Sequence, residues 1–338
     1  MNMRISVAMC TCNGASFLPD QLMSVLAQTR LPDELIICDD CSEDDTLDIV
    51  QETLASVKFS TIVKKNSVRL GPTKNFEQAI SLCTGDVIVL CDQDDVWVSD
   101  KLARLEQSFC MYPDAGYVFS DALIVDERLQ GLGYTLWQAI GFRPQELKKF
   151  KKGQQLEVLL KHNVVTGATL AFRSELRAVV LPIPQEWVHD AWIAFVAACC
   201  GTKGIAMETP LIFYRQHVGQ TIGGRKLKLR ERIARARSVG KKEYLLEIQR
   251  YEQAREHLRT LGINNSWVEK LLDEKIEHLR ARARVWDRPG IQALLAPIEE
   301  LVRGRYWKFS HGWSSFAKDL LVAIGWAREK RFRRASAG

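Results

Sequence analysis

Residues 87–97 read VIVLCDQDDVW, a run of five apolar residues that leads into three carboxylates, Asp92, Asp94 and Asp95. Such an apolar run, ended by polar residues, is typical of a strand buried on both faces of a sheet. Carboxylates this close together repel one another unless a cation neutralises them. The stretch therefore predicts a strand end that holds Mg²⁺ or Mn²⁺, since oxygen ligands suit these ions and a bound ion can bridge a phosphate-bearing substrate. The alternative is a solvated Asp-rich turn.

The residues on both sides of this stretch predict an α/β fold. Before it, short apolar runs alternate with helix-like runs, and this alternation indicates a parallel sheet flanked by helices. Strands are predicted over 5–9, 34–38 and 60–63, and helices over 19–28, 46–57 and 73–82. After it come a helix over 101–111, a strand from Tyr117, a charged loop over 148–152 and a segment, TGATLAF, from Thr166. Ligands of such sheets bind beyond the carboxyl ends of the strands.

A second predicted strand end also carries acidic residues, in the stretch ELIICDDCSEDDT over residues 34–46. Asp39 and Asp40 come at the end of the apolar run, where a carboxylate can accept hydrogen bonds from a nucleobase N–H or a ribose hydroxyl. The chain has no GxGxxG motif and no P-loop, so the sequence gives no support for a dinucleotide or ATP site.

The charge of the chain is unevenly distributed. The net charge is +6, but residues 225–338 hold 27 Lys and Arg against 14 Asp and Glu, whereas the other residues hold 20 against 27. A domain boundary is therefore predicted between 1–222, the α/β domain, and 223–338, a basic and mainly helical extension. The basic part suggests an acidic partner, either anionic lipid or nucleic acid. The alternative is a solvated helical surface.

Cysteine usage and hydropathy predict a cytoplasmic protein. Several of the nine cysteines lie in or beside apolar strand-like runs, and no secretory signal precedes them. The pairs Cys10/Cys12 and Cys38/Cys41 lack the spacing of a zinc knuckle. Because no apolar run reaches the length of about 18 residues needed to span a bilayer, any membrane contact is expected to be peripheral.

The final stretch, residues 307–334, combines aromatic and aliphatic residues with a basic cluster at its end. Such a segment can lie in the headgroup layer of an anionic membrane, here the inner leaflet of the cytoplasmic membrane. The competing prediction is that the aromatic side chains pack against the preceding helices.

Three motifs together resemble glycosyltransferase family 2: AMCTCNG at 8–14, IICDDCSEDDT at 36–46 and VLCDQDDVW at 89–97. The form DQDDVW resembles the rhamnosyltransferase-like members that act in bacterial polysaccharide and O-antigen synthesis. The resemblance covers about the first 220 residues. It implies the GT-A fold, a Rossmann-like nucleotide-diphospho-sugar transferase fold, and inversion at the anomeric carbon with a single catalytic base.

The resemblance also implies roles for individual residues on the donor side. Asp94 and Asp95 are favoured as the metal ligands, with His217 from the stretch FYRQHVGQT as a further ligand. Cys12 stands where an aromatic residue is frequent in the family, which leaves a side-chain contact with the base open. The residues implied in donor binding are Thr11, Asn13, Asp39, Asp40, Asp92, Asp94 and Arg215.

On the acceptor side the resemblance points to QEWVHDAWIAF, residues 185–195. Asp190 falls where the family has its general base, which would remove the proton from the acceptor hydroxyl. The alternative is that Asp190 only caps the following helix. His189 replaces the usual glutamate, Trp192 is a candidate platform for a sugar ring, and Gly167 is expected to let the acceptor approach the backbone.

The sequence thus predicts an inverting, metal-dependent glycosyltransferase of cell-surface glycan synthesis, such as lipopolysaccharide, O-antigen or capsule. The expected donor is a nucleotide-diphosphate sugar, with dTDP-rhamnose as the first candidate, and the expected acceptor is a hydroxyl of a lipid-linked or polysaccharide glycan. A nucleotidyltransferase is the first alternative, but residues 9–17, MCTCNGASF, lack its glycine-rich basic loop. A nucleic-acid-binding module is the second, but the basic part lacks interleaved aromatic residues. A homo-oligomer remains open.

Overall fold

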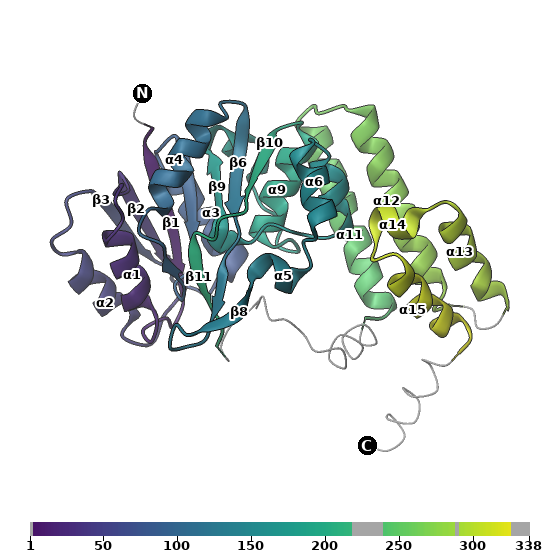
Figure 1. The fold of residues 1–338 in the computed structure, drawn as a ribbon, viewed down its shortest axis with the longest axis horizontal. Coiled ribbons are helices and arrows are strands. Elements are labelled where there is room, and N and C mark those ends of the chain that lie inside the picture. The colour runs from purple at the N-terminus through teal and green to yellow at the C-terminus, as the bar shows by residue number, and fades with distance from the viewer. Residues whose placement is uncertain (1–2, 218–238, 288–290, 326–338) are drawn as a thin grey trace, which may run out of the picture. The chain divides into compact units, whose positions relative to one another are not determined.

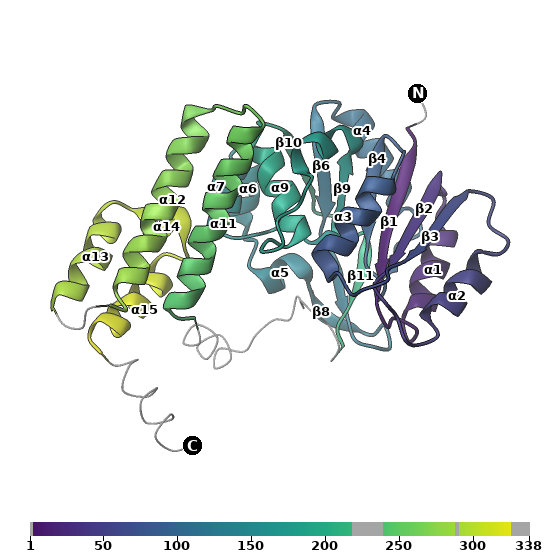
Figure 2. The same ribbon diagram turned by 180° about the vertical axis from the view of Figure 1, so that it is seen from behind.

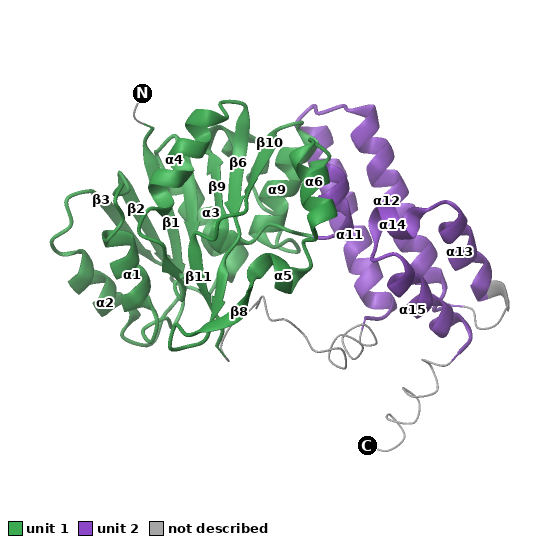
Figure 3. Cartoon of the chain, viewed as in Figure 1, with its two compact units in different colours: residues 1–155, 163–226 green, residues 156–162, 227–338 purple. Residues whose placement is uncertain are grey.

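The computed structural model of the chain describes residues 3–217, 239–287 and 291–325. It divides the chain into two compact units, residues 1–155 with 163–226 and residues 156–162 with 227–338 (Figure 3). The boundary predicted at 222/223 lies outside the described residues. The inclusion of residues 156–162 in the second unit had no signal in the sequence.

The first unit is built on a seven-stranded sheet with the strand order β10-β6-β9-β4-β1-β2-β3. Its strands are β1 (Ile5–Thr11), β2 (Glu34–Asp39), β3 (Ser60–Lys65), β4 (Val87–Cys91), β6 (Ala115–Ser120), β9 (Leu170–Arg173) and β10 (Lys203–Met207). Every residue of β1, β2 and β4 is buried, which explains why their sequences are mostly apolar. At the edge of the sheet, β3 is exposed along its whole length and ends in Lys64 and Lys65.

The four strands of the predicted alternation, β1 to β4, are parallel as predicted, but the sheet as a whole is mixed. β9 runs antiparallel to both of its neighbours, β4 and β6. Because β9 runs against the others, its first residues lie at the edge where the parallel strands end. The 3₁₀ turn before it, η1 (Gly167–Thr169), is thereby brought to the edge that carries the acidic residues.

Helices cover both faces of this sheet (Figures 1 and 2). α3 and α9 lie on one face, and α1 and α4 on the other. The charged loop predicted over 148–152 is instead largely helical, since α6 extends to Lys151. The helices are α1 (Leu18–Leu26), α2 (Thr46–Leu54), α3 (Pro72–Leu82), α4 (Lys101–Met111), α5 (Leu136–Ile140), α6 (Pro144–Lys151), α8 (Arg177–Val180) and α9 (His189–Cys199), with a second 3₁₀ turn, η2 (Ser174–Leu176).

A second, four-stranded sheet joins segments that are far apart in the sequence. Its strands, in spatial order, are β5 (Val96–Trp97), β11 (Ile212–Arg215), β7 (Leu123–Val125) and β8 (Gly131–Thr135). β5 directly follows the acidic stretch and pairs with β11, whose last residue is Arg215. This pairing brings Arg215 and His217 to the acidic residues.

The second unit consists of helices in the described residues. They are α7 (Gln155–Lys161), α11 (Lys241–Thr260), α12 (Ser266–Arg284), α13 (Ile291–Val302), α14 (Arg305–Phe309) and α15 (Trp313–Ala323). Inside the unit, Arg282 donates to Asp319 at 2.7 Å and to the Tyr244 hydroxyl at 2.8 Å. Many of the basic side chains on the surface form ion pairs with neighbouring helices, such as Arg255 with Asp273. Among the described helices, none has the length and apolar character needed to cross a membrane.

Candidate functional site

Strand register brings the acidic stretches of the sequence to one edge of the sheet. In the pairing of β1 with β2, Thr11 is opposite Asp39, and in the pairing of β1 with β4, Met9 is opposite Cys91. Asp92 therefore follows β4 beside the end of β1. Since all three strands are parallel, the loops that follow them form one continuous surface.

Thr11, Asn13 and Asp39 form a network that fixes the two loops after β1 and β2. The Asp39 carboxylate accepts hydrogen bonds from the Thr11 hydroxyl at 2.8 Å and from the Ser42 backbone N–H at 2.9 Å. Asn13 has a left-handed backbone, with φ of 49°, and its side-chain oxygen accepts from the Glu43 N–H. These side chains shape the loops, and their contact with a nucleotide stays a prediction.

Asp40 holds the loop that leads into α3. One carboxylate oxygen accepts from Asn66 Nδ2 and the Leu70 N–H, and the other accepts from the Gly71 N–H at 2.8 Å. Gly71 has φ of 81°, a conformation that favours glycine. Because Asp40 is buried and bonded on both oxygens, the structure supports a role in loop geometry, and its contact with the donor stays a prediction.

The carboxylates after β4 lie close together, and their negative charge is only partly compensated by neighbouring groups. Burial, followed by the charges of Asp94 and Asp190, raises the pKa of Asp92 to about 7. Burial, followed by the charges of Asp94 and Asp92, raises the pKa of Asp95 well above its usual range. Asp95 Oδ1 accepts from the Arg215 N–H at 3.0 Å, whereas Oδ2 is buried without a hydrogen-bond partner. Such a group is stabilised when a cation is added nearby.

His217 and Asp94 form the pair that best fits a divalent cation. His217 Nε2 lies 2.8 Å from Asp94 Oδ2, and the His217 ring packs against Phe17. In the described residues no three His, Cys, Asp or Glu side chains converge as a full ligand set. Mg²⁺ ordinarily takes only one or two protein carboxylates and completes its shell with substrate phosphates and water. The residues present therefore fit a metal that arrives with a nucleoside diphosphate.

Arg215 has a different place from the predicted one. Its side chain is 2% exposed, and the guanidinium donates to the Asp94 and Glu127 carbonyl oxygens and to the Asp20 carboxylate. The guanidinium lies over the Phe17 ring, 4.8 Å from its centroid. Arg215 therefore holds the acidic loop in place through hydrogen bonds from its buried side. The structure does not support direct contact between the Arg215 guanidinium and the donor diphosphate.

Asp190 is a buried carboxylate held in one orientation. It lies in the first turn of α9, where the N-cap residue is Val188, so the alternative that Asp190 is the helix cap is wrong. Its Oδ2 accepts from the Gly167 N–H at 2.8 Å, and its Oδ1 accepts from Asn163 Nδ2 at 3.2 Å and from the Ala191 N–H. Burial raises the pKa of Asp190 to about 6, although these three hydrogen bonds oppose the rise. A carboxylate with this pKa suits a general base near neutral pH.

His189 and Gly167 pack against each other beside this base. The His189 ring stacks on Phe76 with centroids 4.1 Å apart, and burial lowers the pKa of His189 to about 3. A Cβ atom on Gly167 would lie 2.7 Å from His189 Nε2. The space at the Gly167 Cα is therefore filled by His189, and this packing accounts for the glycine. A role of either residue in acceptor binding stays a prediction.

The prediction that Trp192 offers a platform for a sugar is wrong. Trp192 is fully buried, its Nε1 donates to the Val180 carbonyl oxygen at 2.7 Å, and its ring packs edge-on against Trp187. In α9 all residues except Ala191 are buried, so the helix has no free aromatic face.

The sequence reasoning missed three residues of this site: Asn163, Asp20 and Lys101. Asn163 donates to the Asp190 carboxylate, and Asp20 pairs with Arg215 at 2.8 Å. Lys101 is completely buried below the acidic loop. Only Lys101 had a usable signal, since it is a cation at the start of a helix, where the helix dipole disfavours positive charge.

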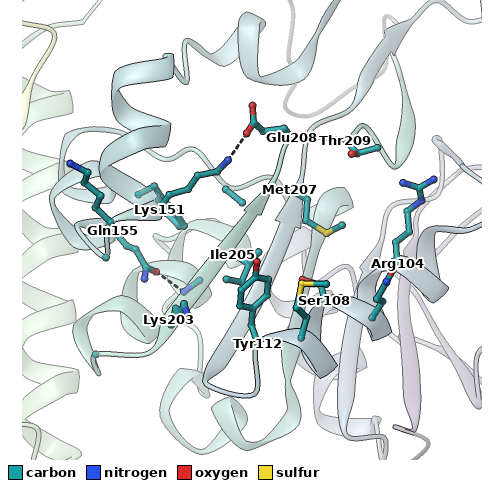
Figure 4. Close-up of a pocket in the computed structure, with 18 residues that line it drawn as sticks. Arg104, Ser108, Tyr112, Lys151, Gln155, Lys203, Ile205, Met207, Glu208 and Thr209 are labelled. Atoms are coloured by element: carbon teal, nitrogen blue, oxygen red, sulfur yellow. Dashed lines mark hydrogen bonds and ion pairs between the residues drawn. The ribbon is translucent and has the colours of Figure 1, made fainter.

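A separate pocket of about 880 Å³ lies at the β10 edge of the first unit (Figure 4). Tyr112, Met207 and Lys203 line it, and Lys151 forms an ion pair with Glu208 there. In the sheet, β6 and β9 separate β10 from β4, a distance of about 14 Å at the usual strand spacing. This pocket is therefore distinct from the carboxylate site.

Comparison with known proteins gives the same family as the motifs. The profile described as "Glycosyl transferase family 2" matches residues 6–179, more than half of the chain. An uncharacterized glycosyltransferase of Nostoc sp. is 30% identical over 223 residues, which cover 64% of this chain and 65% of that protein. The dTDP-rhamnosyl transferase RfbG of Shigella flexneri is 35% identical over 98 residues, 28% of this chain and 34% of that protein. The chain thus matches less than two thirds of the length of these curated relatives.

Solved structures share the fold. TarS of S. aureus in complex with UDP-GlcNAc has a TM-score of 0.55 and 17% identity, with 97% of this chain and 92% of that chain covered. A mannosyltransferase from Pyrobaculum calidifontis in complex with GDP-Man and Mn²⁺ has a TM-score of 0.51 and 17% identity, with 96% and 87% covered. The mixed sheet, its flanking helices and these matches identify the GT-A fold. The chain belongs to glycosyl transferase family 2.

Proposed function

We propose that this protein transfers a sugar from a nucleotide-diphosphate donor to an acceptor hydroxyl, with inversion at the anomeric carbon. One observation carries the proposal: η1, whose Gly167 N–H holds Asp190, lies beside the end of β4, because β9 pairs antiparallel with β4, and the Asp190 charge adds to those that raise the pKa of Asp92. A candidate base for the acceptor and a candidate anchor for the donor phosphates therefore share one site. Direct displacement requires this arrangement, because the attacking oxygen and the departing phosphate act on the same carbon.

In this proposal Asp190 removes the proton from the acceptor hydroxyl as the hydroxyl attacks the sugar. The Gly167 N–H and Asn163 keep the carboxylate oriented for that transfer. Asp94 and Asp95, with His217, would hold Mg²⁺ or Mn²⁺. When bound, the ion would offset the charge that develops on the departing nucleoside diphosphate. The mannosyltransferase solved with Mn²⁺ supports divalent metal use in this fold.

The donor is tested by a screen of nucleotide sugars with purified protein, measuring release of the nucleoside diphosphate. The screen starts with dTDP-rhamnose, supported by the similarity to the Shigella flexneri dTDP-rhamnosyl transferase, and continues with UDP- and GDP-sugars. The proposed acceptors are lipid-linked or polysaccharide glycans of cell-surface synthesis. Failure of every nucleotide sugar to bind or react, with and without Mn²⁺ or Mg²⁺, would refute the proposal.

The pH profile gives a prediction for the wild-type protein. Asp190 acts as a base only when ionised, and its pKa is raised to about 6. Below that pH, kcat/KM is expected to fall about tenfold for each pH unit, since the free enzyme becomes protonated. A profile that stays flat down to pH 4.5, measured with a donor that binds equally well throughout, would show that the base has an ordinary carboxyl pKa and is not Asp190.

Membrane recruitment is a further part of the proposal. Within the final stretch, Phe309 is buried, while Trp307 and Trp313 are 45% and 63% exposed, so the stretch is neither wholly core nor wholly surface. Trp326 and the basic residues 328–334 lie outside the described residues. Each basic residue near an anionic surface contributes about 1 kcal/mol. We therefore propose peripheral binding to anionic lipid on the cytoplasmic side.

Liposome flotation tests this binding. The full chain is expected to float with anionic vesicles at low salt, and a chain ending at Gly325 is expected to remain in the soluble fraction, because it lacks the basic cluster but keeps α15. Vesicles of neutral lipid are the control. Equal flotation of both chains would remove the basic cluster from the explanation, and no flotation of the full chain would end the membrane proposal.

A further inference from the structure

Lys101, the first residue of α4, is a buried cation in the first unit. Its side chain is fully buried, Nζ donates to the Ala168 carbonyl oxygen at 2.9 Å, and Nζ lies 3.8 Å from the centroid of the Trp97 ring. Burial lowers its pKa to about 8, and the negative charges that oppose this include Asp95 and Asp92. A buried ammonium is costly unless charge and hydrogen bonds compensate it. The Lys101 ammonium is therefore expected to have a role that outweighs the cost of its burial.

The Ala168 carbonyl connects Lys101 to the candidate base. Ala168 lies in η1, between Gly167 and Thr169, and the Gly167 N–H donates to Asp190 Oδ2 at 2.8 Å. Thr169 closes the turn, since its N–H and its hydroxyl both donate to the Thr166 carbonyl oxygen. One short turn thus accepts a hydrogen bond from Lys101 and donates one to Asp190 from adjacent residues. A displacement of the turn would move the base.

We propose that Lys101 is a positioning residue for sugar transfer, which ties the turn that orients Asp190 to the strand end that carries Asp92 and Asp95. This inference rests on the proposed roles of Asp190 and of the strand-end carboxylates. The ammonium serves both sides of the site: its charge partly offsets the buried carboxylates, and its N–H fixes the turn. Misplacement of a reacting group by about 1 Å can cost about a hundredfold in rate.

The test is a double-mutant cycle of Lys101→Met with Asp190→Asn. Lys101→Met alone is expected to lower kcat by about a hundredfold, with the donor Kd, from calorimetry, changed by less than about threefold. In the Asp190→Asn background the same change is expected to cost less than about threefold, because the base it positions is already gone. Lys152→Met, an exposed lysine of the same unit, is the matched control and is expected to retain full activity.

A pH profile separates positioning from general loss of structure. The Gly167 hydrogen bond lowers the pKa of Asp190, so loosening the turn is expected to move the acid limb of kcat/KM in Lys101→Met to higher pH. Three results would each overturn the inference. The first is a wild-type kcat in Lys101→Met, and the second is a double mutant whose loss of kcat equals the product of the two single losses. The third is an acid limb of kcat/KM that lies at the same pH in Lys101→Met as in the wild type. If Asp190→Asn alone keeps full turnover, the proposed function fails first, and this inference fails with it.

If Lys101→Met does not fold, as judged by its melting curve, the wild-type protein labelled with ¹³C at lysine Cε provides a second test by NMR. Among the described residues, the ammonium groups of Lys101 and Lys275 are buried and hydrogen-bonded to carbonyl oxygens, so both are expected to be protected from hydrogen exchange. Only the Lys101 signal is expected to shift in Asp190→Asn, and the Lys275 signal serves as the internal control. The absence of any protected lysine signal that changes in Asp190→Asn would overturn the inference.

Discussion

Replacement of Asp190 by Asn is expected to lower kcat by about a hundredfold or more, the usual scale for loss of a general base. Donor affinity, measured by calorimetry, is expected to change little. Asn has nearly the same shape, and its side-chain oxygen can still accept from the Gly167 N–H, so the fold should persist. The amide cannot take a proton from the acceptor at neutral pH, however. The loss should therefore be in turnover and not in binding.

Asp48→Asn is the matched control for this substitution. Asp48 lies in the first turn of α2, as Asp190 lies in the first turn of α9, but its side chain is exposed. We expect Asp48→Asn to match the wild type in kcat and in melting temperature. Loss of donor affinity in Asp190→Asn, with kcat at saturation unchanged, would assign Asp190 to the donor site and leave the base to another residue.

Asp94→Asn is expected to abolish metal-dependent turnover. Asp94 pairs with His217 at 2.8 Å and is only partly buried, so the substitution removes charge from a loop and leaves core packing intact. EDTA is expected to inactivate the wild type, and Mn²⁺ or Mg²⁺ is expected to restore it. In Asp94→Asn the added metal should restore little, because the carboxylate that would hold it is absent.

An exposed aspartate, Asp45, provides the control, since Asp45→Asn changes the same formal charge outside the carboxylate cluster. Its activity and its response to metal are expected to equal those of the wild type. Full activity of Asp94→Asn together with indifference to EDTA would exclude the metal assignment. Manganese affinity in the presence of the nucleoside diphosphate, measured by calorimetry, gives a readout independent of turnover.

The strands that carry the site could be predicted from sequence because burial on both faces leaves an unbroken apolar run. The 87–91 run ends at Cys91 in the structure, where it was predicted to end, and the carboxylates follow it. The direction of β9 could not be predicted in the same way. Strand direction depends on where the chain enters the sheet, and the short run that contains β9 reads alike in either direction.

Two side chains show where residue type alone misled the prediction. An aromatic residue beside a candidate base suggested a sugar platform, but α9 is apolar around its whole circumference, so Trp192 had no exposed face to occupy. Asn163 lies 27 positions before Asp190 in the sequence, outside any motif, and reaches it only because the fold returns to the same edge. Contacts between residues that only the folded chain brings together cannot be predicted from the spacing of residues within a motif.

The assignment of residues 156–162 to the second unit bears on how a gene fragment should be designed. The chain leaves the sheet-bearing unit at residue 155 and re-enters it at 163, before it leaves again for the later helices. Leu156, Val158, Leu159 and Leu160 are buried in the full chain. A truncated protein that ends at residue 226 would contain the sheet and these four apolar side chains, but would lack the later helices of their unit. This product is expected to aggregate. Chimeric proteins that exchange the second unit should therefore replace both of its segments, 156–162 and 227–338, together.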